Sequence, residues 1–383
     1  MRQTIELPTG HFDRRVVKYL DYYIVGCVVI LYLLSLALID SATRDVPGHY
    51  YLKKQGLLVS LAAAALATGT FINLDDLVAL GWYLYGGNML MLAAVFVVGK
   101  SVMGSTRWIS LGVFDFQPSE VAKLATILFL AYMADRRERA PRTFWDLALF
   151  YAVCAPPAVL ILLQPDLGTA LVLFAVATGC LYFAGAPEKL LVKFLAIVAA
   201  TGVCLLLLHF YAGLKLPLEE YQINRILSVF DPQRDPLGSR YQVNQSMIAI
   251  GSGTWWGKGL AKGTQNRLGF IPEQHTDFIF SVAGEELGFT GSIAILSCYG
   301  LLLYRCILAA SRAPTRRGTI VAGGVFSMLL FHVFVNVGMT IGIMPVTGVP
   351  LPFLSYGGSA LIVNSFAIGL VLNVGWTRQK ILF

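Results

Sequence analysis

Residues 272–280 read PEQHTDFIF and place three ionisable side chains, Glu273, His275 and Asp277, directly before a long apolar stretch. A carboxylate in such a place can act as a general base or bind a cation. It can equally cap a helix by accepting hydrogen bonds from the first free backbone amides, which is worth about 1 kcal/mol. At a helix N-terminus, Asp277 would be ionised and its pKa low. The residues alone leave capping and catalysis both open.

Two more carboxylates, Glu285 and Glu286, follow in the same stretch. On a continuous helix they would lie roughly 12 Å further along the axis than Asp277. The spacing of Asp277, Ser281, Gly284 and Glu285 puts these four on one helix face, which predicts a polar cleft along it. Ionisable groups deep in an apolar stretch usually face a cavity or a partner. An internal ion pair that only holds helices together is the alternative for Glu285 and Glu286.

Glu120, Lys123 and Asp166 also have two possible roles. Glu120 and Lys123 lie three positions apart, so on a helix they share a face and could form a purely structural ion pair. Asp166, in the sequence QPDLG, could be a plain helix cap. All three could instead belong to a substrate site.

Basic residues in two other clusters suit an anionic substrate. Arg107 stands beside Trp108, a pair that fits a charged head group with an apolar tail, although Trp is enriched at membrane interfaces in any case. Lys258 and Lys262 lie in a Gly-rich segment whose amides and ammonium groups suit a phosphate, although many such loops are simply solvated. The sequence shows no P-loop and no nucleotide-binding GxGxxG after a strand, which argues against an ATP-driven or nicotinamide enzyme.

The elements that must position these residues are membrane-spanning helices. Of the 383 residues, 56% are hydrophobic and 13% are charged, and the mean hydropathy is +0.68, whereas a soluble domain has about 25% charged residues. We expect an all-α polytopic membrane protein that forms one domain over residues 1–383. Its ten expected spans lie near residues 18–40, 50–72, 77–98, 119–134, 145–163, 168–186, 190–212, 277–308, 318–343 and 355–377.

The net charge of +7 is distributed by side of the membrane, which argues against nucleic acid as a partner. With ten spans and a cytoplasmic N-terminus, Lys and Arg concentrate in the inner loops, as the positive-inside rule requires. Both termini are then cytoplasmic, and a large extracytoplasmic loop at about 213–276 joins the seventh and eighth spans. The polar clusters all fall on the outer face, which predicts a cavity there, because irregular backbone at membrane depth must line a cavity or be covered by protein.

Six motifs resemble, in the same order and over nearly the whole chain, those of the SEDS family (shape, elongation, division and sporulation). The motifs are GSTRWISLG, FQPSEVAKL, LQPDLGTALV, IAIGSGTWWGKGLAKGTQ, PEQHTDFIFSVAGEELG and PVTGVPLPFLSYGGSA. Gly263-Thr264-Gln265 and the stretch from Thr347 to Pro352 are similar to the rod-shape branch, RodA, more than to the division branch, FtsW.

This resemblance implies a peptidoglycan glycosyltransferase that polymerises lipid II into β-1,4 glycan strands during cell elongation and rod-shape maintenance. It would act on the outer face of the bacterial cytoplasmic (inner) membrane, with a class B penicillin-binding protein transpeptidase and other elongation-complex membrane proteins as partners. The family's essential aspartate falls on Asp277, and its important Trp, Glu and Lys fall on Trp108, Glu120 and Lys123. The expected substrate- and diphosphate-binding residues are Arg107, Trp108, Glu120, Lys123, Asp166, Arg225, Lys258, Lys262, Gln274, His275 and Ser355.

The implied chemistry needs one base for the acceptor 4-hydroxyl, for which we expect Asp277, and positive charge for the departing undecaprenyl diphosphate. A single in-line displacement converts the α-linked diphosphate into a β-link with inversion. A divalent cation such as Mg²⁺ or Mn²⁺ could be shared by the carboxylate and the diphosphate. The alternatives are a lipid II flippase, whose site should lie near the membrane midplane, and a noncatalytic scaffold for a transpeptidase.

Overall fold

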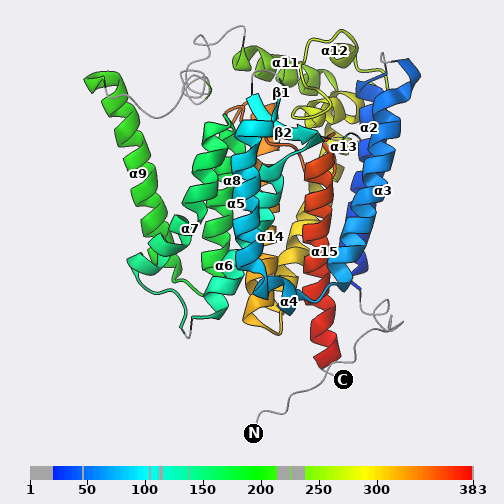
Figure 1. Ribbon diagram of the computed structural model, residues 1–383. Helices are drawn as coiled ribbons and strands as arrows, with labels where there is room; N and C mark the ends of the chain where they lie inside the picture. Colours follow the sequence, from blue (N-terminus) through cyan, green and yellow to red (C-terminus); the bar gives the residue numbers. More distant parts are fainter. Residues whose placement is uncertain are drawn as a thin grey trace.

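The computed structural model describes residues 20–44, 47–102, 105–110, 112, 115–137, 139–213, 225 and 238–381. This part of the chain forms a bundle of ten long helices (Figure 1). They are α2 (Tyr22–Ala42), α3 (Tyr50–Phe71), α5 (Gly81–Val98), α6 (Pro118–Asp135), α7 (Phe144–Leu163), α8 (Leu167–Phe183), α9 (Glu188–Ala212), α13 (Ile279–Ser311), α14 (Arg316–Thr340) and α15 (Gly358–Ile381). Seven of them are long and apolar enough to cross a membrane, and α8 is apolar but shorter. The chain is a multi-pass α-helical membrane protein.

Each of the ten expected spans overlaps one long helix, so the predicted fold class and the order of spans are confirmed. The ends differ by a few residues where a cap decides them. Helix α2, which corresponds to the first expected span, begins at Tyr22, because the Asp21 side chain accepts hydrogen bonds from the amides of Tyr23 and Ile24. Hydropathy alone places this boundary earlier, since it does not detect a capping group.

A small antiparallel sheet between α5 and α6 was not expected from the sequence. Its strands are β1 (Lys100–Val102), β2 (Ser105–Ser110) and β3 (Asp115–Phe116), in the order β1-β2-β3. Ile109 pairs with Phe116 in the β2–β3 register. Strands β1 and β3 are too short to give a period-two hydrophobic pattern, and β2, with the sequence STRWIS, does not alternate apolar with polar residues. Periodicity could therefore not have predicted the sheet.

One end of the bundle carries most of the irregular structure, and we call it the polar end. In Figure 1, the strands and the short helices α11 (Ser239–Ser252) and α12 (Thr264–Arg267) lie there, while the C-terminal end of α15 points to the opposite end. Helix α11 ends at Ser252, and Gly253 is its C-cap. The expected loop at 213–276 lies partly outside the described residues. The remaining short elements are α4 (Leu74–Ala79) and the 3-10 helix η1 (Pro47–His49).

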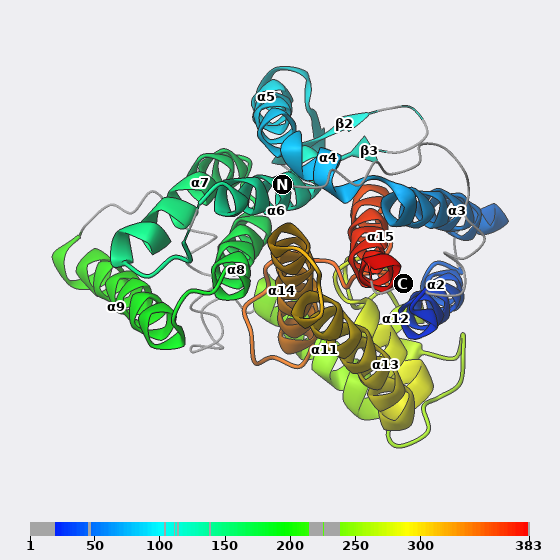
Figure 2. The same ribbon diagram turned by 90° about the horizontal axis from the view of Figure 1, so that it is seen from below.

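The helices differ greatly in how much of their surface packs inside the protein. Within the apolar 18-residue segment of each helix, the buried share is 67% in α14 and 72% in α15, but only 11% in α9. Figure 2 shows α9 at the edge of the bundle, and its two buried side chains, Leu191 and Phe194, lie near its start. Buried polar side chains on α14 and α15 are therefore surrounded by protein and must find partners there.

Helices α3 and α15 pack with direct backbone contact at Gly69 and Gly369. A Cβ added at Gly69 would lie 2.5 Å from the carbonyl oxygen of Phe366, and one at Gly369 would lie 2.3 Å from that of Leu66. Real Cβ atoms do not approach a backbone oxygen so closely. Small residues allow this close approach, which is a main source of helix association within a membrane.

We expect Gly69→Ala to lower the thermal unfolding midpoint of the purified protein in detergent, because overpacking a tight contact costs roughly 1–3 kcal/mol. The matched control is Gly56→Ala on the same helix, where an added Cβ meets no atom within 4 Å. That control should unfold at the wild-type temperature or slightly above it. Equal midpoints for the two variants would contradict the direct backbone contact.

Candidate active site

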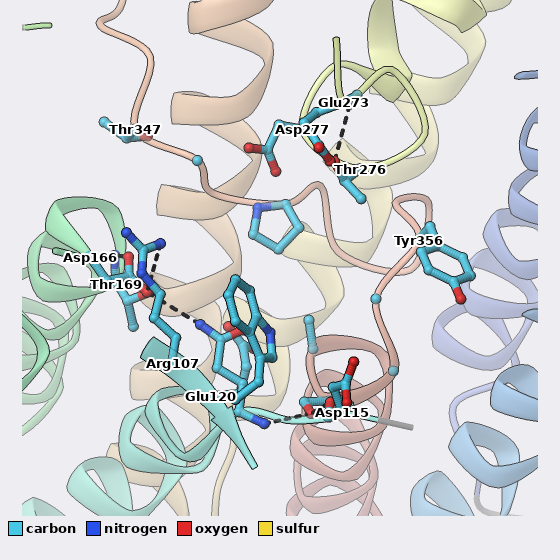
Figure 3. Close-up of a pocket in the computed structure, with 18 of the residues that line it drawn as sticks. Arg107, Asp115, Glu120, Asp166, Thr169, Glu273, Thr276, Asp277, Thr347 and Tyr356 are labelled. Carbon is cyan, nitrogen blue, oxygen red and sulfur yellow. Dashed lines mark hydrogen bonds and ion pairs between the residues drawn. The ribbon is translucent and has the colours of Figure 1, made fainter. Parts of the chain in front are cut away.

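A cavity of about 450 Å³ opens at the polar end, between the sheet and the ends of several helices (Figure 3). Its walls come from β2, β3, α6, α8, the segment before α13 and the segment before α15. Six of the residues expected in a site line it: Arg107, Trp108, Glu120, Asp166, Arg225 and Asp277. Segments as far apart in the sequence as the β2 strand and the PEQHTDFIF motif thus meet at one place. This confirms the expectation that the polar clusters share a cavity.

Asp277 is half-buried in the wall of this cavity, with its carboxylate directed inward (Figure 3). Burial, together with the nearby negative charge of Glu273, raises the pKa of Asp277 to about 7, although Arg225 and Arg107 oppose the shift. A carboxyl group with this pKa exchanges its proton near neutral pH. It is therefore suited to general-base catalysis.

The expectations that Asp277 caps a helix and has a low pKa were both wrong. Helix α13 begins at Ile279, its N-cap position is Phe278, and no side chain of the described residues caps it. Asp277 precedes the first turn, so it does not accept hydrogen bonds from the free amides there. Without these hydrogen bonds, burial and like charge determine the pKa instead.

The backbone of Asp277 is held by the buried amide of Asn336 on α14. The Asn336 Nδ2 donates to the carbonyl oxygen of Asp277 and to that of Val349, each at 2.8 Å. One side chain thus joins the segment before α13 to the segment before α15. Both carbonyl groups are at least partly buried. Loss of the Asn336 donor would therefore lower the stability of the folded protein by roughly 1–3 kcal/mol.

The segment before α15 approaches Asp277 closely at Gly348. This glycine has φ of +71°, and an added Cβ would lie 3.5 Å from the Asp277 Oδ2 atom. A residue with a side chain would be strained there and would narrow the space beside the carboxylate. The neighbouring Thr347 lines the cavity, and its hydroxyl is buried without a hydrogen-bond partner among the described residues. This hydroxyl could bond to a substrate only if the Thr347 side chain turned toward the cavity.

A chain of polar contacts forms the opposite wall. Arg107 donates from Nε to the Gln164 carbonyl oxygen at 2.8 Å and from Nη2 to that of Pro165, and it lies 3.9 Å from Asp166. Asp166 caps α8 by accepting from the Thr169 amide at 3.1 Å, as expected. These contacts fix the guanidinium at the wall of the cavity. Asp166 can then serve both as a cap and as part of the site.

Glu120 and Lys123 form the predicted ion pair on α6, with Lys123 Nζ 2.8 Å from each carboxylate oxygen. Glu120 lines the cavity, whereas Lys123 is completely buried beside it and is not among the lining residues. Lys123 therefore cannot contact a substrate directly in this arrangement. Lys123 acts on the cavity only by binding the Glu120 carboxylate.

Comparison with known proteins identifies the family of this chain. The model of the FtsW, RodA and SpoVE family, described as cell cycle proteins, matches residues 15–380. The chain belongs to this family. It is 41% identical over 304 residues to the peptidoglycan glycosyltransferase MrdB of Escherichia coli, covering 79% of this chain and 80% of that protein. It is 35% identical over 359 residues to the probable peptidoglycan glycosyltransferase FtsW of Nitrosomonas europaea, covering 92% and 89%.

Solved structures of the family have the same fold. One, from a study of a peptidoglycan synthase complex that coordinates polymerization and crosslinking, matches with a TM-score of 0.78 and 35% identity over 94% of this chain and 99% of that one. The rod shape determining protein RodA of Thermus thermophilus matches with a TM-score of 0.68 and 32% identity over 94% and 97%. The SEDS resemblance drawn from the motifs is thus confirmed.

Two other family motif residues, Glu285 and Glu286, do not line the cavity, so the cleft predicted along their helix face was wrong. Helix α13 is broken at Gly288, where φ is +69°. Glu285 accepts hydrogen bonds from Lys258 Nζ at 2.7 Å and from the amide of Thr264 at 2.7 Å. Glu286 accepts from Ser41, close to the end of α2. Both carboxylates therefore hold the polar-end loop in place and do not lie deeper along the bundle.

Five more expected site residues are not among the described residues that line the cavity. Lys258 is bound to Glu285, and Lys262 is exposed in the same loop. Gln274 donates to the Ala42 carbonyl oxygen at 2.7 Å, and Ser355 accepts from the Leu351 amide at 2.8 Å. These four contribute, in this structure, to the loops around the cavity and not to its surface.

The fifth, His275, packs behind the cavity wall in an aromatic cluster with Tyr51 and Tyr356, with ring centroids 5.0 and 5.6 Å away. Burial lowers the pKa of His275, so it is neutral near pH 7. Its carbonyl oxygen accepts from the Tyr356 amide at 2.9 Å. His275 therefore supports Tyr356, which does line the cavity.

Lys54 and Asn336 are site residues that the sequence analysis missed. Lys54 lines the cavity from α3, and a lysine within an expected span is itself a signal of function. Asn336 lies in the middle of an apolar stretch in which a buried amide needs partners. Neither signal specifies which distant segment supplies the partner.

We expect Asn336→Leu to fold but to lose most of its activity, measured as lipid II polymerisation by the purified protein. The change leaves the carbonyl groups of Asp277 and Val349 without a donor and frees both segments. Activity should fall by about 10-fold or more, as for the loss of roughly 1–3 kcal/mol at a positioned catalytic group. The matched control is Asn88→Leu, which removes a buried amide bonded to the Pro118 carbonyl oxygen at 3.0 Å. If Asn336→Leu were as active as the control or more active, Asn336 would not be needed to hold the two segments together.

Proposed function

We propose that this chain is a peptidoglycan glycosyltransferase that polymerises lipid II into β-1,4 glycan strands during cell elongation. The observation that carries the proposal is the cavity, in which the Asp277 carboxyl has a pKa of about 7 and lies among the cations Lys54, Arg107 and Arg225. A base and a group of positive charges are the two components that this transfer needs. The names of the family's similar members support the same activity.

In the proposed reaction, the 4-hydroxyl oxygen of the acceptor sugar forms a bond to C1 of the donor sugar. The bond from C1 to the diphosphate oxygen breaks, and its electron pair leaves with undecaprenyl diphosphate. The hydroxyl proton passes to Asp277. Because the diphosphate is already a good leaving group, no acid is needed to protonate it, in contrast to a glycoside hydrolase.

The cations lie where the charge of the diphosphate would have to be balanced. Arg107 is held by backbone carbonyl groups, so it needs little rearrangement to face an anion. Lys54 and Arg225 reach the cavity from other segments. We infer that the three together stabilise the diphosphate as it departs, and that Trp108 packs on the apolar part of the lipid.

A divalent cation such as Mg²⁺ or Mn²⁺ fits the same place. Glu273 and Asp277 both line the cavity, and their mutual repulsion contributes to the raised pKa of Asp277. Mg²⁺ commonly uses one or two carboxylates together with substrate phosphates. Among the described residues, no three His, Cys, Asp or Glu side chains form a metal-binding group, so the substrate would have to supply ligands. When bound, the ion would neutralise charge on the diphosphate.

We further propose that the polar end faces outward from the bacterial cytoplasmic membrane. Arginines gather at the opposite end, where Arg317 pairs with Asp135 at 2.7 Å and Arg137 pairs with Asp146 at 2.8 Å. An excess of Arg and Lys marks the cytoplasmic side. Lipid II would then be polymerised outside the membrane, with both termini inside the cell.

A class B penicillin-binding protein and other elongation-complex membrane proteins are the proposed partners. The support is the fold shared with a chain from a peptidoglycan synthase complex, whose description combines polymerization with crosslinking. A transpeptidase beside the cavity would receive the glycan strand as it leaves.

A lipid II flippase is the competing function. A transporter should bind its substrate near the midplane between repeats, whereas this cavity lies at the polar end. Purified protein with lipid II in detergent separates the two, because detergent micelles have no second side for transport. Polymer formed under these conditions supports the transferase, and its absence in the presence of the partner supports the flippase or a scaffold.

Asp277→Asn should abolish polymer formation from lipid II, by at least about 100-fold, because the amide cannot accept the hydroxyl proton. The folded state should not be weakened. Since folding raises the pKa of Asp277 to about 7, ionisation above that pH destabilises the wild type, and the stability present at low pH is lost as the pH rises through 7. At about pH 8 the variant should therefore unfold at the wild-type temperature or higher.

The matched control for Asp277→Asn is Asp76→Asn, an exposed carboxylate on α4. It should polymerise lipid II at the wild-type rate. Polymer yield from monodisperse Asp277→Asn equal to that of this control would remove Asp277 from the role of base.

A further inference from the structure

A fully buried group of three ionisable side chains lies directly behind the cavity, where α6 packs against α14. Lys123 Nζ is 2.8 Å from both carboxylate oxygens of Glu120 and 2.9 Å from Nε2 of His332. The three residues are at most 2% exposed. Glu120 and Lys123 belong to a motif noted in the sequence, but His332 stood in an apolar stretch without any such signal.

The hydrogen bonds of this group determine which ring nitrogen of His332 carries the proton. Its Nδ1 lies 2.8 Å from the Met328 carbonyl oxygen, which can only accept, so Nδ1 carries the proton. Nε2 of the neutral ring is then an acceptor and faces the Lys123 ammonium. A lysine ammonium has three N–H donors, and here each has a partner: two go to the carboxylate and one goes to the imidazole.

This complete pairing matters because the group is buried. A lysine that is taken out of water needs both a counter-charge and partners for its remaining donors. Without His332, one N–H would be left unpaired, and the ammonium could turn or shift to find another acceptor. Among the described residues, only Lys123 donates hydrogen bonds to the Glu120 carboxylate, so such a shift would also move this carboxylate.

Glu120 lines the cavity, while Lys123 and His332 are not among its lining residues. Each carboxylate oxygen keeps a lone pair beyond the one used by Lys123. Glu120 can therefore accept a hydrogen bond from a donor on the substrate, such as a sugar hydroxyl or the N–H of an acetamido group. The orientation of Glu120 decides whether that bond forms.

We propose that His332 is a positioning residue for the transfer: it fixes Lys123, and through Lys123 it orients Glu120 toward a hydroxyl or amide donor of the sugar substrate. This inference rests on the proposed function and adds a residue on α14 to the site. His332 itself does not touch the substrate.

Three substitutions distinguish positioning from simple packing. His332→Gln places its amide near the position of Nε2 and can still accept from Lys123, whereas His332→Asn places its amide near Nδ1 and falls short. His332→Leu fills similar space without an acceptor. Polymerisation of lipid II by the purified protein should fall by about five- to 100-fold in His332→Leu and His332→Asn, as expected for one unpaired buried donor. His332→Gln should recover most of the rate.

A mutant cycle provides the second measurement. In a Lys123→Met background no ammonium remains to be positioned, so adding His332→Leu should cause no further loss beyond about twofold. Ser327→Ala on the same helix is the matched control, because among the described residues Ser327 donates only to the Gly323 carbonyl oxygen of its own helix, at 2.9 Å. It should act at the wild-type rate.

The outcomes separate the two proposals. Wild-type protein that makes no polymer, even with its partner, would contradict the proposed function. Active wild type with equal rates for Gln, Asn and Leu at position 332, whether all high or all low, would overturn the positioning role alone. Additive losses in the mutant cycle would overturn it as well.

Discussion

The site depends on one buried amide. Asn336 donates to the carbonyl oxygens of Asp277 and Val349, and it is the link between two segments that enter the bundle from different helices. Neither segment has regular secondary structure to hold it. Irregular backbone is tolerated at membrane depth only where its polar groups find partners in protein or water. The amide provides such partners and, by doing so, fixes where the Asp277 carboxylate points.

The second constraint is electrostatic and follows from the first. Once Asp277 is held against protein beside Glu273, removal from water and like charge raise its pKa to about 7. Two other carboxylates have ion-pair partners. Glu120 is paired with Lys123, and Glu285 is bound by Lys258 and backbone amides. Asp277, in contrast, forms no salt bridge among the described residues, so its carboxyl group stays available to take up a proton.

Much of this could be predicted from the sequence. Hydropathy predicted the ten long helices, although only seven of them meet a strict criterion of length and apolar character. The one-sided placement of the polar motifs predicted the cavity. The Asp166 cap and the Glu120–Lys123 pair follow from local spacing alone. The errors concern residues whose partners are distant. The break at Gly288 redirects Glu285 to the loop, and the start of α13 at Ile279 leaves Asp277 outside the helix. His332 and Asn336 find partners on other elements, which no local pattern encodes.

The role of Asp277 as the base can be tested by the pH dependence of lipid II polymerisation by the purified protein. If Asp277 is the base and its pKa is about 7, the rate is low while the carboxyl is protonated and rises as the pH passes through about 7. It should then level off by about pH 8.5. A rate that is already maximal at about pH 5, as for a carboxylate with an ordinary pKa near 4, would show that Asp277 is not a base with this raised pKa.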